Sequence, residues 1–385
     1  MKIVIKAALF LLGIAFCSLA WGMEARAGEK ENNGFSYIED WLSTCDLGQI
    51  NKGMDSLFPG IEIDAKECLS LIIGGEIQEA FKRVFQGVKE GLAGEVSGIR
   101  QIFIYILILG IVSALFAEFS DLFAGQQIAQ AGFYFLYLFL MVILTKVFLF
   151  VSQTAAAAME DIVLFIKLFI PTYFVAVGTA QGSASAVYYY QLMLIIAYLV
   201  ESFLNRMLVP FIYSYVMLAL LNGLWAEEKL TLLLEFLEKG IVLALKVSMG
   251  AVTGLSLVQA VIVPVASRLK ISAMRKAVSV IPGIGGVAEG VTELMLGSAV
   301  LIKNSMGVFL LILLLCACIM PLFKILVVTG TVKLAAALTG IVSDKRLSLC
   351  ADRAGEGCFL LFRCVFTSVA LFIIVIAVVS YTISA

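Results

Sequence analysis

The sequence predicts an all-α fold: a polytopic helical membrane protein of eight or nine transmembrane helices that follows a small exported helical domain. Two observations carry this prediction. Of 385 residues, 62% are hydrophobic and only 14% are charged, with a mean hydropathy of +1.04, whereas soluble domains are about 45–50% apolar and about 25% charged. Apolar runs of about 20 residues, the length that a bilayer crossing requires, also recur from residue 99 to the C-terminus.

Residues 1–27 have the pattern of a secretory signal peptide. Lys2 and Lys6 form a short basic start, and an apolar run shorter than a bilayer span follows them. Ala25 and Ala27 then place small residues at the two positions that a signal peptidase reads, which predicts cleavage after Ala27 and export of the residues that follow. The alternative is an uncleaved first membrane anchor.

Residues 28–98 are predicted to form an exported, acidic, helical domain. They contain 6 basic and 13 acidic residues. Between residues 77 and 89, apolar side chains recur at helical spacing with charged side chains on the other face. This stripe either packs within the domain or lies on the membrane or on a partner. Cys45 and Cys68 are the two cysteines of the segment, and export permits a disulfide between them, but the sequence leaves the pairing open.

Residues 99–385 are predicted to form the transmembrane domain. Each span must be a helix, because lipid offers no water to satisfy the backbone. Residues 306–341 are too long for one straight crossing and contain Pro321, which predicts either one kinked helix or a tight pair. The candidate spans are 99–119, 130–151, 162–178, 186–204, 207–225, 241–265, 306–320, 321–341 and 359–381.

The signal peptide sets the predicted orientation of these spans, because it places residues 28–98 outside. Simple alternation then puts residues 227–239 inside and the basic cluster at 268–276 outside, against the positive-inside tendency. A re-entrant span around Pro171, an interfacial helix carrying the cluster, or an unusual outer compartment would remove the conflict. Residues 225–239 are amphipathic, which is typical of an in-plane helix, of a docking surface or of the solvated extension of a span.

The sequence offers no set of residues typical of an enzyme. It contains no histidine, which excludes Ser-His-Asp and Cys-His catalytic pairs and His-ligated metal sites. Residues 283–288 match Gly-x-Gly-x-x-Ala, but a dinucleotide-binding fingerprint follows a strand, whereas Pro282 and membrane spans surround this match. We therefore expect a protein that is not an enzyme and has no cofactor or metal. The few basic residues also form no dense patch that would bind nucleic acid.

Five charged residues are candidates for a polar pathway or an assembly contact. Lys167, Lys246 and Lys324 lie deep in apolar spans, where a charge costs about 2.5–3.5 kcal/mol on insertion scales. Glu289 and Glu293 lie one helical turn apart in a glycine-rich segment. The alternative for charges near the ends of spans is that long side chains snorkel to the membrane surface.

The glycine-rich segment at residues 277–305 is neither a plain loop nor a full span. Irregular backbone at membrane depth is tolerated only where it is buried in protein or lines a cavity. Pro282, Gly283, Gly285 and Gly286 are therefore candidates for a gate or hinge. The alternative is an interfacial helix–turn–helix.

Three short motifs, in this order, resemble the stage III sporulation protein AE family. They are Val-Ile-Pro-Gly-Ile-Gly at 280–285, Val-Leu-Ile-Lys-Asn-Ser-Met-Gly at 300–307 and Pro-Leu-Phe-Lys-Ile-Leu at 321–326. They come after a cleavable signal and an acidic exported segment, and the resemblance runs from about residue 60 to the end of the chain. Because the motifs are short and hydrophobic, their order and spacing carry the resemblance.

The resemblance implies a multi-pass protein of the mother-cell membrane, made during endospore formation, with its N-terminal domain exported toward the forespore. It implies membership of a complex that forms a channel-like conduit between the two cells and is needed for late forespore gene expression. The implied partners are other membrane subunits, ring-forming subunits, a cytoplasmic ATPase and a partner in the forespore membrane. The family supplies no catalytic residues to carry over.

Two functions from different classes follow. The first is a non-enzymatic component of a trans-envelope channel complex, and the second is a self-contained membrane transporter or permease for a small solute. The lack of an obvious inverted repeat in the sequence disfavours the transporter. A transporter moves its solute when reconstituted alone, whereas a complex subunit is inert alone and co-purifies with other envelope proteins.

Overall fold

The structure is a computed structural model of the chain. It describes residues 51, 65–82, 104–105, 108, 111–112, 126–181, 195–224, 229–278, 285–342 and 345–381. These residues are almost entirely helical, which agrees with the predicted all-α class. The predicted signal peptide with Ala25 and Ala27, Cys45, and the predicted hinge residues Pro282 and Gly283 lie outside the described residues.

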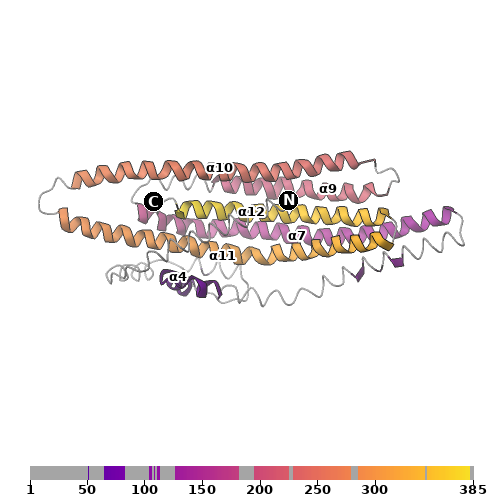
Figure 1. Ribbon diagram of the computed structural model, residues 1–385, viewed down its shortest axis with the longest axis horizontal. Helices are drawn as coiled ribbons and strands as arrows, with labels where there is room; N and C mark the ends of the chain where they lie inside the picture. The colour runs from indigo at the N-terminus through magenta and orange to yellow at the C-terminus, as the bar shows by residue number, and fades with distance from the viewer. Residues whose placement is uncertain are drawn as a thin grey trace.

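Long helices run side by side and form an elongated bundle (Figure 1). A short helix, α4 (Ala65–Ile73), lies against one of them, α11. The long elements are α7 (Gln126–Gln181), a helix over residues 195–222, α10 (Thr231–Val278), α11 (Gly285–Val342) and α12 (Lys345–Tyr381). Within the helix at 195–222, the π-helical turn η1 (Leu204–Leu208) leads directly into α9 (Val209–Asn222).

Five of these helices are long and apolar enough to cross a membrane, which indicates a multi-pass membrane protein. The 56 residues of α7 extend about 84 Å at a rise of 1.5 Å per residue, whereas the hydrocarbon core of a bilayer is about 30 Å thick. Helices of this length project beyond the lipid. The apolar segments are Ala131–Lys167, Ile195–Asn222, Thr231–Val258, Ser305–Ile341 and Lys345–Ile376.

The structure joins two predicted spans in α7. The sequence separates residues 130–151 from 162–178 at a polar stretch, 153–161, yet the helix continues through it. Four consecutive alanines in this stretch have the highest helix propensity of any residue. The hydroxyl of Thr154 also has a hydrogen-bond partner within the helix, because it donates to the carbonyl of Phe150 at 2.9 Å. A drop in hydropathy therefore marks a change of surroundings here and not the end of a helix.

Residues 195–222 also join two predicted spans, 186–204 and 207–225. At the predicted boundary the backbone forms η1, in which the amide of Val209 donates to the carbonyl of Leu204. Pro210 follows at once; it has no amide hydrogen and is tolerated in the first turn of a helix. The wider turn allows the helix to continue past the proline.

A third pair of predicted spans, 306–320 and 321–341, lies on α11, which contains Pro321 in its interior. Of the two alternatives for this stretch, the single helix agrees with the structure and the tight pair is wrong. The eight or nine predicted crossings become five long apolar helices among the described residues, because three pairs of spans each share one helix. Span 99–119 lies largely outside the described residues.

The centre of the bundle is α12 (Figure 1), which packs against α7, α9, α10 and α11. Of its most apolar window, 72% is buried, the largest share among the five helices. A helix that is apolar on nearly all sides requires neighbours on all sides. Gly357 allows the closest approach, since a Cβ there would overlap Val216 of α9 and lie 3.7 Å from the Phe148 ring of α7.

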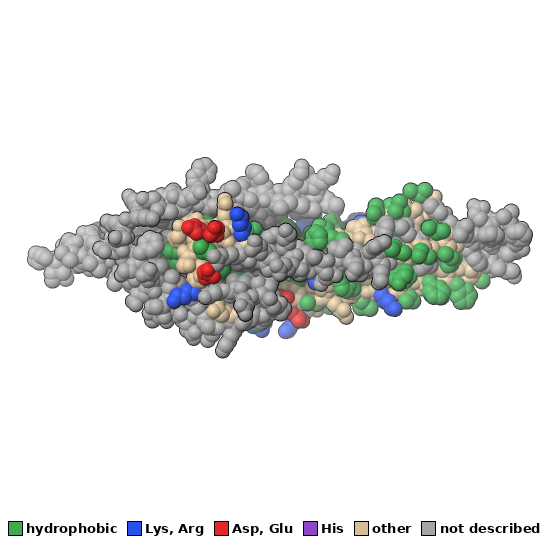
Figure 2. All heavy atoms as spheres, turned by 90° about the horizontal axis from the view of Figure 1, so that it is seen from below, with side chains coloured by type: hydrophobic (Ala, Val, Ile, Leu, Met, Phe, Trp, Pro, Cys, Tyr) green, Lys and Arg blue, Asp and Glu red, His purple; other side chains and the backbone are tan. Residues whose placement is uncertain are grey.

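The outer faces of the long helices carry many exposed hydrophobic side chains. Figure 2 shows one face of the molecule, on which such side chains gather toward one end. Large contiguous apolar surfaces are rare on soluble monomers and mark contact with a membrane or a partner. Exposed examples are Phe135 and Phe139 on α7, Phe236 and Leu243 on α10, and Phe323 and Ile341 on α11.

The described part of the predicted exported domain packs on a membrane helix of the same chain. Leu69 and Ile72 of α4 are buried, and α4 contacts α11. Gly75 ends α4 with a positive φ of 86°, a conformation that glycine adopts without steric cost. Ile77 and Ala80, which begin the predicted apolar stripe, pack into the same core.

Most of the predicted amphipathic stretch, residues 231–239, belongs to the third apolar helix, α10. Residues 231–239 form the first turns of α10, and Asn222 fixes the turn that precedes them. Its Oδ1 accepts the amide of Leu230 at 2.8 Å, and its Nδ2 donates to the hydroxyl of Thr231 at 3.4 Å. The basic cluster at 268–276 lies at the opposite end of the same helix.

Candidate functional site

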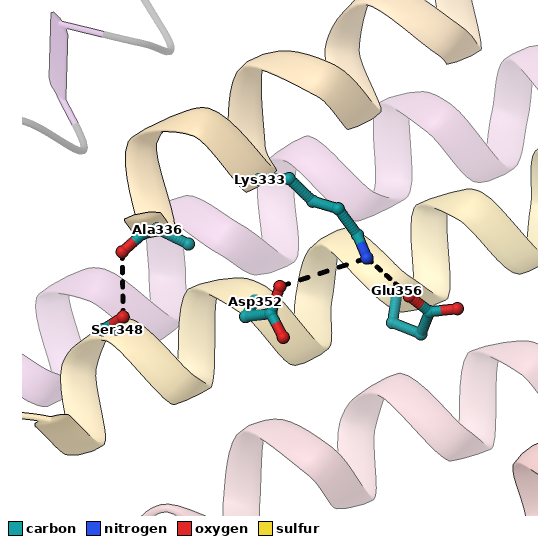
Figure 3. A network of polar contacts seen from close by, with 5 residues as sticks. All are labelled: Lys333, Ala336, Ser348, Asp352 and Glu356. Carbon is teal, nitrogen blue, oxygen red and sulfur yellow. Dashed lines mark hydrogen bonds and ion pairs between the residues drawn. The ribbon is translucent and has the colours of Figure 1, made fainter. Parts of the chain in front are cut away.

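A cluster of ion pairs joins the last turns of α11 to the first half of α12 (Figure 3). The Nζ of Lys333 lies 2.5 Å from the carboxylate of Glu356 and 4.0 Å from that of Asp352. Because the two acidic residues are four positions apart on α12, their carboxylates share one helix face. The hydroxyl of Ser348 donates to the carbonyl of Ala336 at 2.8 Å and holds the two helices together beside the cluster.

Small and aromatic residues shape this cluster. Gly355 allows the aliphatic part of the Lys333 side chain to pack closely against α12, since a Cβ at residue 355 would lie 2.7 Å from the Cγ of the lysine. The Phe359 ring centre lies 6.0 Å from the Lys333 ammonium and 4.4 Å from the guanidinium carbon of Arg363. Such cation–π contacts contribute about 0.5–1 kcal/mol at exposed sites. Glu238 of α10 interacts electrostatically with both cations, so three helices contribute to the cluster.

The ion-pair cluster is partly open to the surroundings. The side chain of Lys333 is 38% exposed, that of Glu356 is 23% exposed and that of Asp352 is 57% exposed. Exposed ion pairs contribute only about 0.2–1 kcal/mol to stability. The arrangement therefore joins α11 to α12 only weakly and leaves charged groups where water or a partner can reach them.

Contacts of α7 hold the helix ends around this cluster. The hydroxyl of Tyr137 donates to the carbonyl of Leu220 on α9 at 2.6 Å. Arg346, in the first turn of α12, lies with its guanidinium carbon 4.9 Å from the centre of the Phe133 ring. Gly223 allows the tyrosine to approach, since a Cβ there would overlap its hydroxyl. The start of α7 is thus fixed to both α9 and α12.

A second polar contact lies inside the bundle. Glu201, in the helix at 195–222, is 0% exposed, and its Oε2 accepts a hydrogen bond of 2.5 Å from the hydroxyl of Ser368 on α12. Its other carboxylate oxygen, Oε1, has no hydrogen-bond partner. The residue lies three positions before η1, and single π-helical turns are frequent at functional sites. Burying an ionisable residue inside a membrane span is costly, so such residues are rare. Where one occurs, it is a candidate functional group.

The three lysines predicted from the sequence lie on three different helices. Lys167 on α7 and Lys246 on α10 have exposed side chains, whereas Lys324 on α11 is half-buried. An exposed lysine on an otherwise apolar outer face must be met by water, by lipid headgroups or by another protein. Their predicted role in a polar pathway or in assembly stays a prediction.

The residues of the predicted gate divide at the start of α11. Gly285 and Gly286 are its first two residues, and Glu289 and Glu293 follow one turn apart in the same helix. The backbone from residue 285 onward is therefore helical and not irregular. The residues directly before it lie outside the described part of the chain, so a hinge there stays a prediction.

Sequence reasoning did not select the residues that the structure brings together. Glu201 lies near the end of the predicted span 186–204, where a charge is easily tolerated, but the structure places it inside a 28-residue apolar helix. Asp352 and Glu356 have the spacing that puts two carboxylates on one helix face, and this signal was available. Their pairing with Lys333 depends on how α11 and α12 pack against each other, and hydropathy does not report helix packing.

Comparison with known proteins identifies the family. The family model described as stage III sporulation protein AE matches residues 63–382, which include α4 and all five long apolar helices. Stage III sporulation protein AE of Bacillus subtilis (strain 168) is 20% identical over 258 residues, a match that covers 67% of this chain and 65% of that relative. No solved structure matches the chain. Because the family model covers most of the chain, the protein belongs to the stage III sporulation protein AE family.

Proposed function

We propose that the protein is a non-enzymatic integral membrane component of a channel complex between mother cell and forespore, required for endospore formation and late forespore gene expression. The observation that carries this proposal is the family match over residues 63–382, because it includes every long apolar helix that the structure describes. The proposed partners are other membrane subunits, ring-forming subunits, a cytoplasmic ATPase and a partner in the forespore membrane.

Two structural features support the role of a subunit. Lys167 and Lys246 are exposed on helices that are long and apolar enough to cross the membrane, and neighbouring subunits would supply the polar surroundings that such charges require. The ion-pair cluster of Lys333, Asp352 and Glu356 is also partly exposed, so a partner could reach its charges.

The proposed orientation follows from the sequence. A cleaved signal peptide would place residues 28–98 in the space between the two membranes, where they would be available to the forespore partner. Because the two ends of α10 are far apart on one helix, residues 231–239 and 268–276 would face opposite sides of the mother-cell membrane.

Co-purification tests the proposal. The full chain, tagged at its C-terminus and expressed during sporulation, is extracted in mild detergent and its companions are identified by mass spectrometry. We expect the ring-forming subunits and the ATPase to be recovered, and to be lost from cells that express the tag on an unrelated multi-pass protein. Recovery of the chain alone would contradict the proposal.

Reconstitution distinguishes the alternative. The purified chain in liposomes is expected to move no solute by itself, because a subunit lacks the rest of its conduit. Solute uptake that saturates and follows an imposed ion gradient would instead support a self-contained transporter.

A further inference from the structure

The carboxylate of Glu201 is the charged group most completely enclosed by the described helices. Its side chain is 0% exposed, and so is that of Ser368, which donates to Oε2 from α12. The second oxygen, Oε1, accepts no hydrogen bond. One half of this carboxyl group is therefore satisfied by the protein and the other half is not.

The described neighbours of Glu201 bring no positive charge. The thiols of Cys318 on α11 and Cys364 on α12 are close enough to interact with the charge of Glu201, and both are buried. Asp161 of α7 acts electrostatically on the same Cys318. In the part of the chain that the structure describes, Glu201 forms no ion pair with a lysine or arginine.

A carboxylate enclosed in this way lacks the partner that its charge requires. Moving an ion out of water is costly unless a countercharge and hydrogen bonds compensate for the lost hydration. Here Ser368 supplies one hydrogen bond to Oε2, and no described group supplies one to Oε1. The missing component is a cation at Oε1.

The donor set distinguishes a proton from a metal ion. Hard cations such as Ca²⁺ bind about six to eight oxygen ligands. The described oxygen ligands here are the two oxygens of the Glu201 carboxylate itself and the hydroxyl of Ser368, and the two described side chains on which Glu201 acts electrostatically are thiols. A proton requires one oxygen only.

We propose that Glu201 is a proton-binding site within the membrane-spanning bundle. Oε1 takes a proton from water and becomes a neutral hydroxyl, and it returns the proton to water when the site empties. The hydrogen bond from Ser368 to Oε2 is kept in both states. The inference concerns the chain itself and does not rest on the proposed function.

The position of the site gives proton binding a structural consequence. Glu201 lies between the helix at 195–222 and α12, three residues before the π-helical turn η1. A charge that appears on Oε1 disfavours close packing between these two helices. Because a π-helical turn already interrupts the regular hydrogen bonding of the first helix, the backbone beside the site is the part best able to adjust.

A hydrophobic carbodiimide tests the proposal, because it modifies protonated carboxyl groups in apolar surroundings. The purified full chain in detergent is treated with dicyclohexylcarbodiimide, and the modified peptide is mapped by mass spectrometry. We expect an adduct on Glu201 that is lost in Glu201→Gln and kept in Asp161→Asn. Failure of the folded chain to form the adduct would overturn the proposal.

Two further measurements cover the other outcomes. Addition of Na⁺, K⁺ or Ca²⁺ should leave the adduct yield unchanged, and protection by one of these ions would show a metal site instead. Glu201→Gln, which imitates the neutral form, should melt close to the wild-type temperature, whereas Glu201→Lys should melt lower. A large loss of stability in Glu201→Gln would show that the packing requires the charged carboxylate, which contradicts proton binding.

Discussion

The residue that limits the packing of α12 most closely is Gly357. It lies where α12 meets both Val216 of α9 and Phe148 of α7, and all three residues are buried. Protein interiors are packed so densely that one added methyl group is felt. By contrast, Gly330 of α11 is exposed, and a Cβ there would meet nothing within 4 Å.

Gly357→Ala is therefore expected to destabilise the protein by about 1–3 kcal/mol, the usual cost of overpacking a core. Thermal unfolding of the detergent-solubilised chain, followed by tryptophan fluorescence, measures the effect. The matched control is Gly330→Ala, which should be neutral or stabilising, because alanine favours a helix over glycine by about 0.8–1.0 kcal/mol. Equal melting temperatures for the two variants would show that the close contact at residue 357 does not exist.

A double-mutant cycle tests the ion pair between Lys333 and Glu356. The pair is short but partly exposed, so we expect a coupling energy of about 0.5–1 kcal/mol, in the range for exposed pairs. Denaturant unfolding of Lys333→Ala, Glu356→Ala and the double variant provides the coupling. The same cycle with Asp352, at 4.0 Å, should give a smaller value. A larger coupling to Asp352 than to Glu356 would contradict the observed geometry.

At the scale of elements, α10 sets the orientation of the second half of the chain. Its first turns carry the exposed pair of Glu235 and Lys239, and its last turns carry the basic cluster at 268–276. Residues 239 and 272 are 33 positions apart on one helix, which corresponds to about 50 Å at 1.5 Å per residue. That length exceeds a hydrocarbon core of about 30 Å, so both ends cannot lie within the lipid if α10 crosses it.

We expect Lys239→Cys and Ser272→Cys to react with a membrane-impermeant maleimide from opposite sides of the membrane. Labelling of intact and inverted membrane vesicles measures this. The background is low among described residues, because Cys68, Cys316, Cys318, Cys350, Cys358 and Cys364 are buried. The unsubstituted chain is the control for the cysteines outside the described residues. Labelling of both positions from the same side would mean that α10 does not cross.

The elements also show what hydropathy can predict. The helical membrane class followed from composition, because lipid permits no other structure for long apolar segments. The division into spans failed at the polar stretch 153–161 and at residues 205–206, since hydropathy reports the preferred solvent of a segment and not the continuity of its backbone. Polar residues satisfied within the helix, such as Thr154, leave α7 unbroken.

At the scale of the whole molecule, the candidate sites depend on packing between helices that are distant in sequence. Glu201 and Ser368 are 167 positions apart, and no local pattern brings them together. Lys333 and Glu356 are only 23 apart, and a helical hairpin with a short turn would have predicted their contact. The three lysines could be selected from sequence because their signal, a charge in an apolar run, is local; their role stays a prediction.

The exposed lysines lead to a prediction about assembly. In an isolated chain, the side chains of Lys167 and Lys246 are exposed on apolar helices. A charge at the centre of a bilayer costs about 2.5–3.5 kcal/mol on insertion scales. Lys167→Leu and Lys246→Leu should therefore insert at normal abundance but recover less of the sporulation complex in a pull-down from sporulating cells.

The matched control is Lys239→Leu, because Lys239 already has a partner on its own helix, Glu235 at 3.2 Å. This variant should recover the complex as well as the wild type does. If the lysines instead snorkel to the membrane surface, all three variants will assemble equally and form spores normally, and the assembly role will be wrong. Lys324→Leu separates a role in packing from a role in assembly, because Lys324 is half-buried. If only this variant loses abundance, Lys324 acts within the fold, whereas Lys167 and Lys246 would still act between subunits.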